Sequence, residues 1–107
     1  MSTEKIRTLN DNLRTTLKGG RVMLSAGVAA LSDRSRGAAL KAVRTYSTFG
    51  PDNDPHGEHD FGALDIEGKK LFWKINYYDR KCELGSENPS DPAQTTRVLT
   101  ICLAEEY

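Results

Sequence analysis

The sequence predicts an α+β domain in which two helices pack on an antiparallel sheet of three or four strands with a central hairpin. In the first half of the chain, apolar residues recur at helical spacing. In the second half, they gather in three short runs that are rich in β-branched and aromatic residues. Because helices come first and strands afterwards, a regular βαβ arrangement is not expected.

The first expected element is an amphipathic helix that begins at Ser2 or Thr3, either of which can cap it, and ends before Gly19. Its apolar stripe consists of Ile6, Leu9, Leu13 and Leu17. The other face is polar and is expected to be solvated; it carries Glu4, Lys5, Arg7, Asn10, Asp11 and Arg14.

A short β-prone run at 21–24 follows, and then a turn and a small apolar patch at 28–31. A second helix is predicted from Ser32, as N-cap, to about Ser47, because Leu40, Val43 and Tyr46 keep helical spacing. Its basic residues are expected to form a solvated face, since no aromatic residues alternate with them as in a nucleic-acid surface; they are Arg34, Arg36, Lys41 and Arg44.

Two long loops and three strands make up the rest of the chain. Residues 50–60 contain two prolines, two glycines and no aliphatic residue, and residues 80–94 are equally rich in turn formers. Between them, the runs 61–66 and 70–78 predict a hairpin. With Gly68 and Lys69 as its turn residues, Leu64 pairs with Trp73 and His59 pairs with Tyr78. The run 95–104 alternates and predicts the last strand.

Composition excludes several classes of function. The chain of 107 residues fits a single domain, 1–107, and its 15 basic and 15 acidic residues give no net charge, so no general attraction to nucleic acid is expected. The longest apolar stretch, 22–31, is too short to span a membrane, and no signal-peptide pattern is visible, so a cytoplasmic protein is expected. The two cysteines have no zinc-ligand spacing.

Polar chemistry is concentrated between Asp52 and Phe61. Carboxylates and imidazoles of this segment are of the types that bind divalent metals: Asp52, Asp54, His56, Glu58, His59 and Asp60. Their spacing fits no established ligand pattern, however, and the same residue types form turns and bind backbone groups in loops. We therefore expect a structural role and no cofactor, with a divalent metal on Glu58, His59 and Asp60 as the alternative.

The predicted register brings this segment beside the second hairpin strand, and a polar pocket could result. His59 would act as a general base, Asp60 would orient it, and Lys74 or Arg97 would hold an anion. The candidate catalytic residues are Glu58, His59, Asp60 and Lys74. The candidate binding residues are Asn53, Asp54, Tyr77, Tyr78 and Arg97. The alternative is a buried polar network that locks the loop to the sheet.

Three segments resemble a bacterial family that is classed only as a domain of unknown function: 53–62 (NDPHGEHDFG), 73–79 (WKINYYD) and 96–107 (TRVLTICLAEEY). The resemblance covers nearly the whole chain, including 9–11 and 27–28. It implies a small protein of a kind often found on plasmids or other mobile elements. The family pattern has Tyr in place of His56 and Asp in place of Asn76. This implies that neither residue is an indispensable ligand, and it favours 58–60.

Two functional hypotheses follow. The first is an accessory protein of a mobile element that binds a protein partner, for example as an inhibitor of a restriction or CRISPR complex. The zero net charge and the lack of a catalytic motif favour it, whereas the mobile element is implied only by the resemblance. The second is a small metal-dependent hydrolase or nuclease that uses Glu58, His59 and Asp60. A scaffold whose polar segment is wholly structural is a third possibility, and the oligomeric state stays open.

Overall fold

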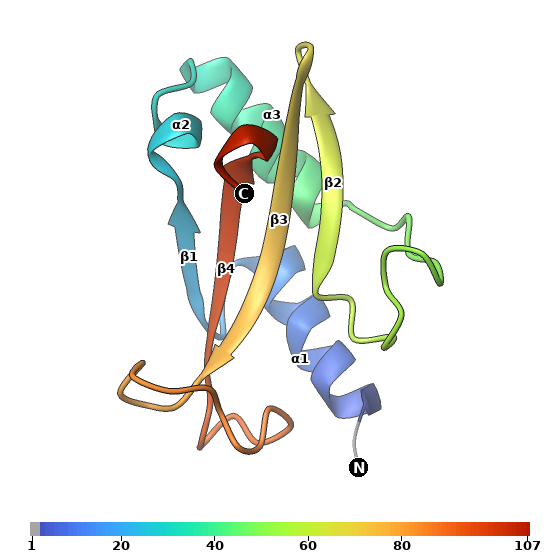
Figure 1. The fold of residues 1–107 in the computed structure, drawn as a ribbon, viewed down its shortest axis with the longest axis vertical. Helices are drawn as coiled ribbons and strands as arrows, with labels where there is room; N and C mark the ends of the chain where they lie inside the picture. Colours follow the sequence, from blue (N-terminus) through green and yellow to red (C-terminus); the bar gives the residue numbers. More distant parts are fainter. Residues whose placement is uncertain (1–2) are drawn as a thin grey trace.

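The computed structural model describes residues 3–107, so the predicted cap at Ser2 lies outside the described residues. Its elements follow one another from the N-terminus in the order helix, strand, two helices, three strands and a 3-10 turn (Figure 1). They are α1 (Thr3–Thr16), β1 (Arg21–Leu24), α2 (Ala26–Ala29), α3 (Asp33–Arg44), β2 (Phe61–Ile66), β3 (Lys69–Tyr78), β4 (Thr96–Leu103) and η1 (Ala104–Glu106). The predicted α+β class is confirmed, and α2 is an addition to the predicted elements.

The sheet has the strand order β1-β4-β3-β2, and one of its pairs differs from the prediction. β2 with β3 and β3 with β4 are antiparallel, whereas β1 runs parallel to β4 with Arg21 opposite Val98 and Leu24 opposite Ile101. The antiparallel expectation is confirmed for these two pairs and is wrong for the pair of β1 with β4. Parallel neighbours need a long crossover connection. Here everything from α2 to β3 lies between the two strands.

The hairpin of β2 and β3 turns one residue earlier than predicted. Glu67 and Gly68 both have positive φ angles, 49° and 83°, as a type I′ turn requires. Leu64 consequently pairs with Leu71 rather than with Trp73. This moves every pair by two residues and leaves the faces of the strands unchanged, because side chains alternate with a period of two.

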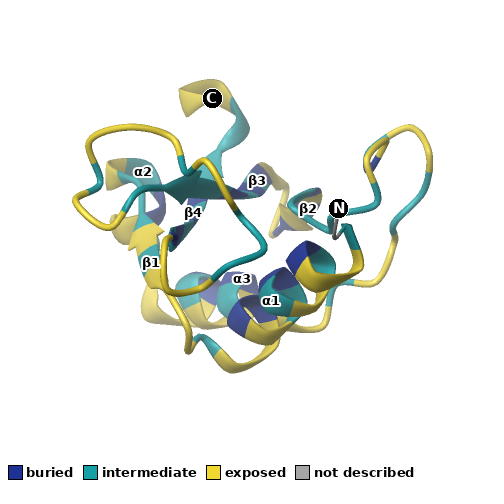
Figure 2. Ribbon diagram, turned by 90° about the horizontal axis from the view of Figure 1, so that it is seen from below, coloured by how far each residue is buried: buried dark blue, intermediate teal, exposed yellow. Residues whose placement is uncertain are grey.

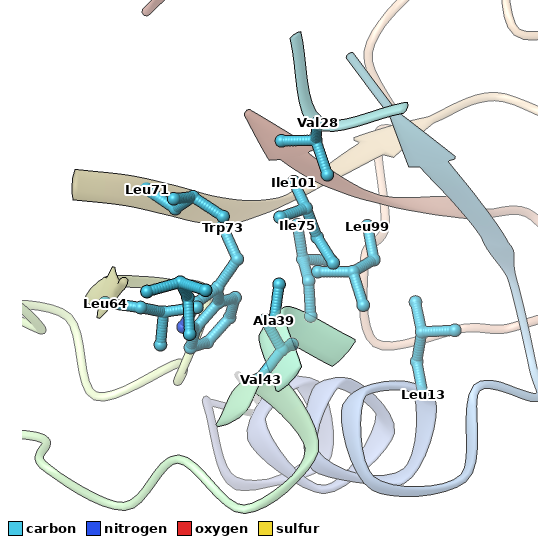
Figure 3. Close-up of a cluster of buried hydrophobic side chains, with 11 residues drawn as sticks. Leu13, Val28, Ala39, Val43, Leu64, Leu71, Trp73, Ile75, Leu99 and Ile101 are labelled. Atoms are coloured by element: carbon cyan, nitrogen blue, oxygen red, sulfur yellow. The ribbon is translucent and has the colours of Figure 1, made fainter. Parts of the chain in front are cut away.

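The helices α1 and α3 cover one face of the sheet, and the C-terminal turn lies on the other side (Figure 2). The covered face supplies most of the core, and α1, α2 and α3 add residues that point toward it (Figure 3). Its buried members are Leu13, Val28, Ala39, Val43, Leu64, Ile66, Leu71, Trp73, Ile75, Leu99 and Ile101. Each large side chain buried in this way contributes about 1.5–3 kcal/mol.

The polar face of α1 is solvated only in part: Glu4 and Lys5 are exposed as predicted, whereas two of the other residues are buried. Asn10 is fully buried and Arg14 is 5% exposed. Arg14 Nη1 donates to the carbonyl oxygens of Val43, at 3.1 Å, and of Tyr46, at 2.8 Å, where α3 ends. A cation is favourable there because the helix dipole places partial negative charge at this end. Arg14 thus joins the two helices.

Within residues 3–107, no helix combines the length and the apolar character needed to cross a membrane.

Candidate functional site

The polar segment 53–60 lies between α1 and the end of β3. Arg7 Nε donates to the Gly57 carbonyl at 2.7 Å, and Asn10 Nδ2 donates to the Glu58 carbonyl at 3.0 Å. At the start of the segment, Asn53 Nδ2 donates to the Tyr46 hydroxyl at 3.0 Å, and Asn53 Oδ1 accepts from Gly50 N at 2.8 Å. The predicted loop is confirmed, and Asn53 holds it in shape.

Glu58 belongs to a partly buried chain of hydrogen bonds that crosses from the loop to the sheet. The Tyr77 hydroxyl donates to Glu58 Oε1 at 2.6 Å and accepts from Asn10 Nδ2 at 2.8 Å. Asn10 Oδ1 in turn accepts from Arg97 Nε at 2.9 Å, and the Arg97 guanidinium lies over the Tyr77 ring. Burial, followed by the bond to the Glu58 carboxylate, raises the pKa of Tyr77, so the phenol stays protonated as the donor.

His59 is held on three sides. Its Nδ1 lies 2.9 Å from Asp11 Oδ1, and its Nε2 lies 3.7 Å from Asp54 Oδ2. The ring stacks on Phe49 with a centroid distance of 3.8 Å and an interplanar angle of 3°. The backbone of His59 has a φ of 56°, and its N–H donates to Asp54 Oδ1 at 3.1 Å. Contacts on both ring nitrogens and one ring face anchor His59 as a link between the loop and α1.

Asp60 extends the hairpin ladder by one residue, because its carbonyl accepts from Ile75 N at 2.9 Å. Its side chain is half-buried. Burial raises the pKa of the Asp60 carboxyl, and the neighbouring charges of Glu58 and Asp54 add to this, while Lys74 acts in the opposite direction. Glu58 and Asp60 are therefore close enough to affect each other, as the sequence predicted, but each is oriented by a different part of the fold.

The structure separates other residues that the sequence placed together. Arg97, on β4, joins Glu58 and Tyr77 as part of the network. Lys74 and Tyr78 alternate with the buried residues of β3 and so belong to its other face. The predicted pairing of Tyr78 with His59 is wrong, because the register is shifted and β2 begins only at Phe61.

Four residues of this region were missed or misplaced by sequence reasoning: Asn10, Asp11, Arg14 and Phe49. A signal existed for Asn10, which lies four residues after Ile6 and three before Leu13, on the buried stripe of α1. The other three have no such signal, because their partners become visible only when the loop is packed.

The polar segment closes upon itself instead of surrounding an open pocket. Three cavities of about 450, 580 and 390 Å³ are lined by residues elsewhere on the molecule, although Arg97 reaches the last of them. Among residues 3–107, no group of three or more His, Cys, Asp or Glu side chains is arranged to hold a metal ion. The metal-dependent hydrolase stays a prediction without a geometric basis in this part of the chain.

Comparison with known proteins gives a family but no activity. Residues 24–106, which run from the last residue of β1 to the end of η1, match the family described as "Protein of unknown function (DUF3768)". No curated protein and no solved structure matches the chain. The matched range contains Glu58, Tyr77 and Arg97 and begins after α1, which supplies Asn10. Since the match covers more than half of its length, the chain belongs to this family of proteins of unknown function.

Proposed function

We propose that the protein acts by binding a partner protein through the outer face of its sheet, the face that α1 and α3 leave uncovered. The observation that carries the proposal is an aromatic cluster on this face, formed by Phe61, Phe72 and Tyr107. Its ring centroids lie 5.1–5.9 Å apart. Tyr107 is 66% exposed, so much of the cluster is open to a partner.

The outer face also carries an exposed methionine on the opposite edge strand of the sheet. The register places Phe61, Lys74, Thr100 and Met23 in one row over the four strands, and Met23 is 53% exposed. Aromatic residues and methionine are enriched in protein interfaces. This composition, together with the zero net charge of the chain, favours a protein over a nucleic acid or a lipid surface.

The C-terminal turn is held in place, so the cluster is formed before a partner arrives. Glu106 Oε1 accepts from the Ser25 hydroxyl at 2.6 Å and from Leu103 N at 2.8 Å, and Glu106 Oε2 accepts from Gly27 N at 2.9 Å. These bonds lower the pKa of the Glu106 carboxyl. A surface that is rigid in advance loses less conformational entropy on binding.

The partner is the more specific part of what we propose. We infer that it is a component of a host defence system, such as a restriction or CRISPR complex, and that the protein serves a plasmid or another mobile element as its inhibitor. The support for this part is the resemblance of segments 53–62, 73–79 and 96–107 to a family often found on such elements. The lack of a recognisable catalytic motif agrees with it.

The test measures binding of the purified protein to purified restriction and CRISPR effector complexes, together with the rate at which these cleave target DNA. Tyr107→Ala and Met23→Ala should each weaken binding and inhibition about tenfold, as loss of an exposed interface anchor does. Leu84→Ala is the matched control, since Leu84 is 71% exposed but lies in the loop after β3. If no complex is bound or inhibited, the defence role is wrong. If the three variants bind alike, the outer face is not the interface.

A further inference from the structure

A cavity of about 390 Å³ lies at the end of the sheet where α1 ends and β1 begins. Figure 1 shows the loop between β3 and β4, in orange, at the same end of the molecule. The lining of the cavity includes three arginines, Arg21, Arg80 and Arg97, and no acidic residue among the described part of the chain. These arginines come from β1, from the loop and from β4, so the fold collects three positive charges from distant positions in the sequence.

Arg97 is the buried member of the group, with 2% of its surface exposed. Its Nε donates to Asn10 Oδ1 and its Nη2 donates to the Pro89 carbonyl, and both acceptors are neutral. Its Nη1 makes no hydrogen bond within residues 3–107, and no carboxylate oxygen of these residues lies within 4.0 Å of the guanidinium. The Glu58 carboxylate, which acts on Arg97 from a distance, is already bound by Tyr77. A buried cation without a paired charge is unfavourable, so this site favours an added anion.

Arg21 and Arg80 supply the exposed side of the cavity. Arg80 Nη1 donates to the Pro92 carbonyl at 3.3 Å, and neither arginine forms an ion pair with a described residue. Gly20 brings the chain close to β4 at this point, because a Cβ on it would lie only 2.6 Å from the Arg97 carbonyl oxygen. The close approach packs the backbone just before Arg21 against β4 at the edge of the cavity.

We propose that this cavity binds a phosphate group, either as free phosphate or as the phosphate monoester of a small molecule. Guanidinium groups match the geometry of phosphate oxygens with paired hydrogen bonds. Three arginines line the cavity and no acidic residue of the described part of the chain does, so an anion is favoured there over a cation. The volume is in the range of small-ligand sites, so a mononucleotide fits the proposal in size. The site is separate from the aromatic cluster and independent of the proposed protein partner.

Calorimetric titration at constant ionic strength tests the proposal with inorganic phosphate, AMP and uncharged adenosine. Phosphate or AMP should bind and raise the melting temperature, because a ligand of the native state stabilises it. Adenosine should do neither. Tighter binding of AMP than of phosphate would identify a phosphate monoester as the ligand, and the reverse would identify free phosphate. The absence of binding by both anions would overturn the proposal.

Variants distinguish the site from general charge attraction. Arg21→Gln and Arg80→Gln change exposed residues and should each weaken binding about tenfold while the fold is kept. Arg34→Gln removes the same charge from α3, where the Arg34 side chain is 91% exposed, and should leave binding unchanged. If Arg34→Gln weakens binding as much as the other two, or if none of the three weakens it, the cavity is not the binding site.

Discussion

Three distant parts of the chain meet at Asn10. Its amide nitrogen donates to the Glu58 carbonyl of the loop and to the Tyr77 hydroxyl of β3, and its oxygen accepts from Arg97 of β4. Because Asn10 is fully buried, a lost partner cannot be replaced by water. The hydrogen bonds of this region therefore give its polar residues a structural role.

Tyr77→Phe tests the role of this network. The change removes the hydroxyl that joins Glu58 to Asn10 and should lower the free energy of unfolding by about 1–3 kcal/mol, the cost of leaving buried polar groups unpaired. Urea denaturation measures it. Tyr78→Phe is the control, because Tyr78 lies on the outer face of the same strand, and it should change stability by less than about 0.5 kcal/mol. Equal effects of the two changes would contradict the network.

The raised pKa of Asp60 makes a second prediction at this scale. Burial and the charges of Glu58 and Asp54 raise its pKa above 3.8, so the folded state holds the proton more tightly than the unfolded state. The free energy of unfolding therefore falls as the pH rises from the pKa of Asp60 in the unfolded state to its higher pKa in the folded state. Asp60→Asn should be more stable than the natural protein at pH 7, and the gain should vanish below pH 3.8.

Thermal melting as a function of pH checks this expectation. Asp65→Asn is the control, since Asp65 is an exposed carboxylate on β2. A gain in stability that stays the same at low pH, or that Asp65→Asn shows equally, would contradict the assigned environment of Asp60.

At the residue scale, the sequence singled out Glu58, Tyr77 and Arg97 as candidate site residues. It wrongly placed Asn10 and Arg14 on a solvated face of the first helix. Asn10 could have been recognised by its position on the apolar stripe of α1. The burial of Arg14 could not have been recognised, because its partners are carbonyl oxygens at the end of α3. Every residue has a backbone carbonyl, so the sequence does not indicate which of them will accept a hydrogen bond from a side chain. The side chains of Glu58 and His59 are oriented by contacts with elements far away in the chain, which the sequence does not reveal.

At the scale of elements, amphipathic helices and alternating strands were predicted well because their burial pattern is local. The direction of β1 was not, since a four-residue strand carries no information about which neighbour it pairs with. The hairpin register was ambiguous because turns at 67–68 and at 68–69 both include Gly68 and bury the same faces. The helix α2 spans only four residues, too few to show helical periodicity.

Substitutions at two glycines test how closely β2 and α3 pack against their neighbours. A Cβ on Gly62 would lie 2.4 Å from Trp73 Nε1 and 2.7 Å from Tyr46 Cζ, whereas a Cβ on Gly37 would meet nothing within 4 Å. Gly62→Ala should therefore lower the free energy of unfolding by about 1–3 kcal/mol through overpacking. Gly37→Ala, in the interior of α3, should raise it by up to about 1 kcal/mol through helix propensity. Urea denaturation measures both, and a stable Gly62→Ala protein would contradict the packing of β2 on Trp73.

For the whole molecule, the two faces of the sheet have different roles. The inner face carries the core and, at one end, the network around Asn10. The outer face carries the aromatic cluster and Met23 without a covering helix. The cavity lined by Arg21, Arg80 and Arg97 lies at the end of the sheet beside β1, next to the network around Asn10, with which it shares Arg97. We therefore assign stability to the segment 53–60, and the proposed function assigns recognition to the outer face.

Partner affinity per folded molecule, measured together with melting temperature, tests this division most directly. His59→Ala removes the links to Asp11, Asp54 and Phe49, so it should lower the melting temperature and leave the affinity of the folded protein unchanged. Tyr107→Ala should weaken binding about tenfold at nearly the same melting temperature. The opposite result, with binding lost in a stable His59→Ala protein and kept in Tyr107→Ala, would contradict the account and place the active surface at 58–60.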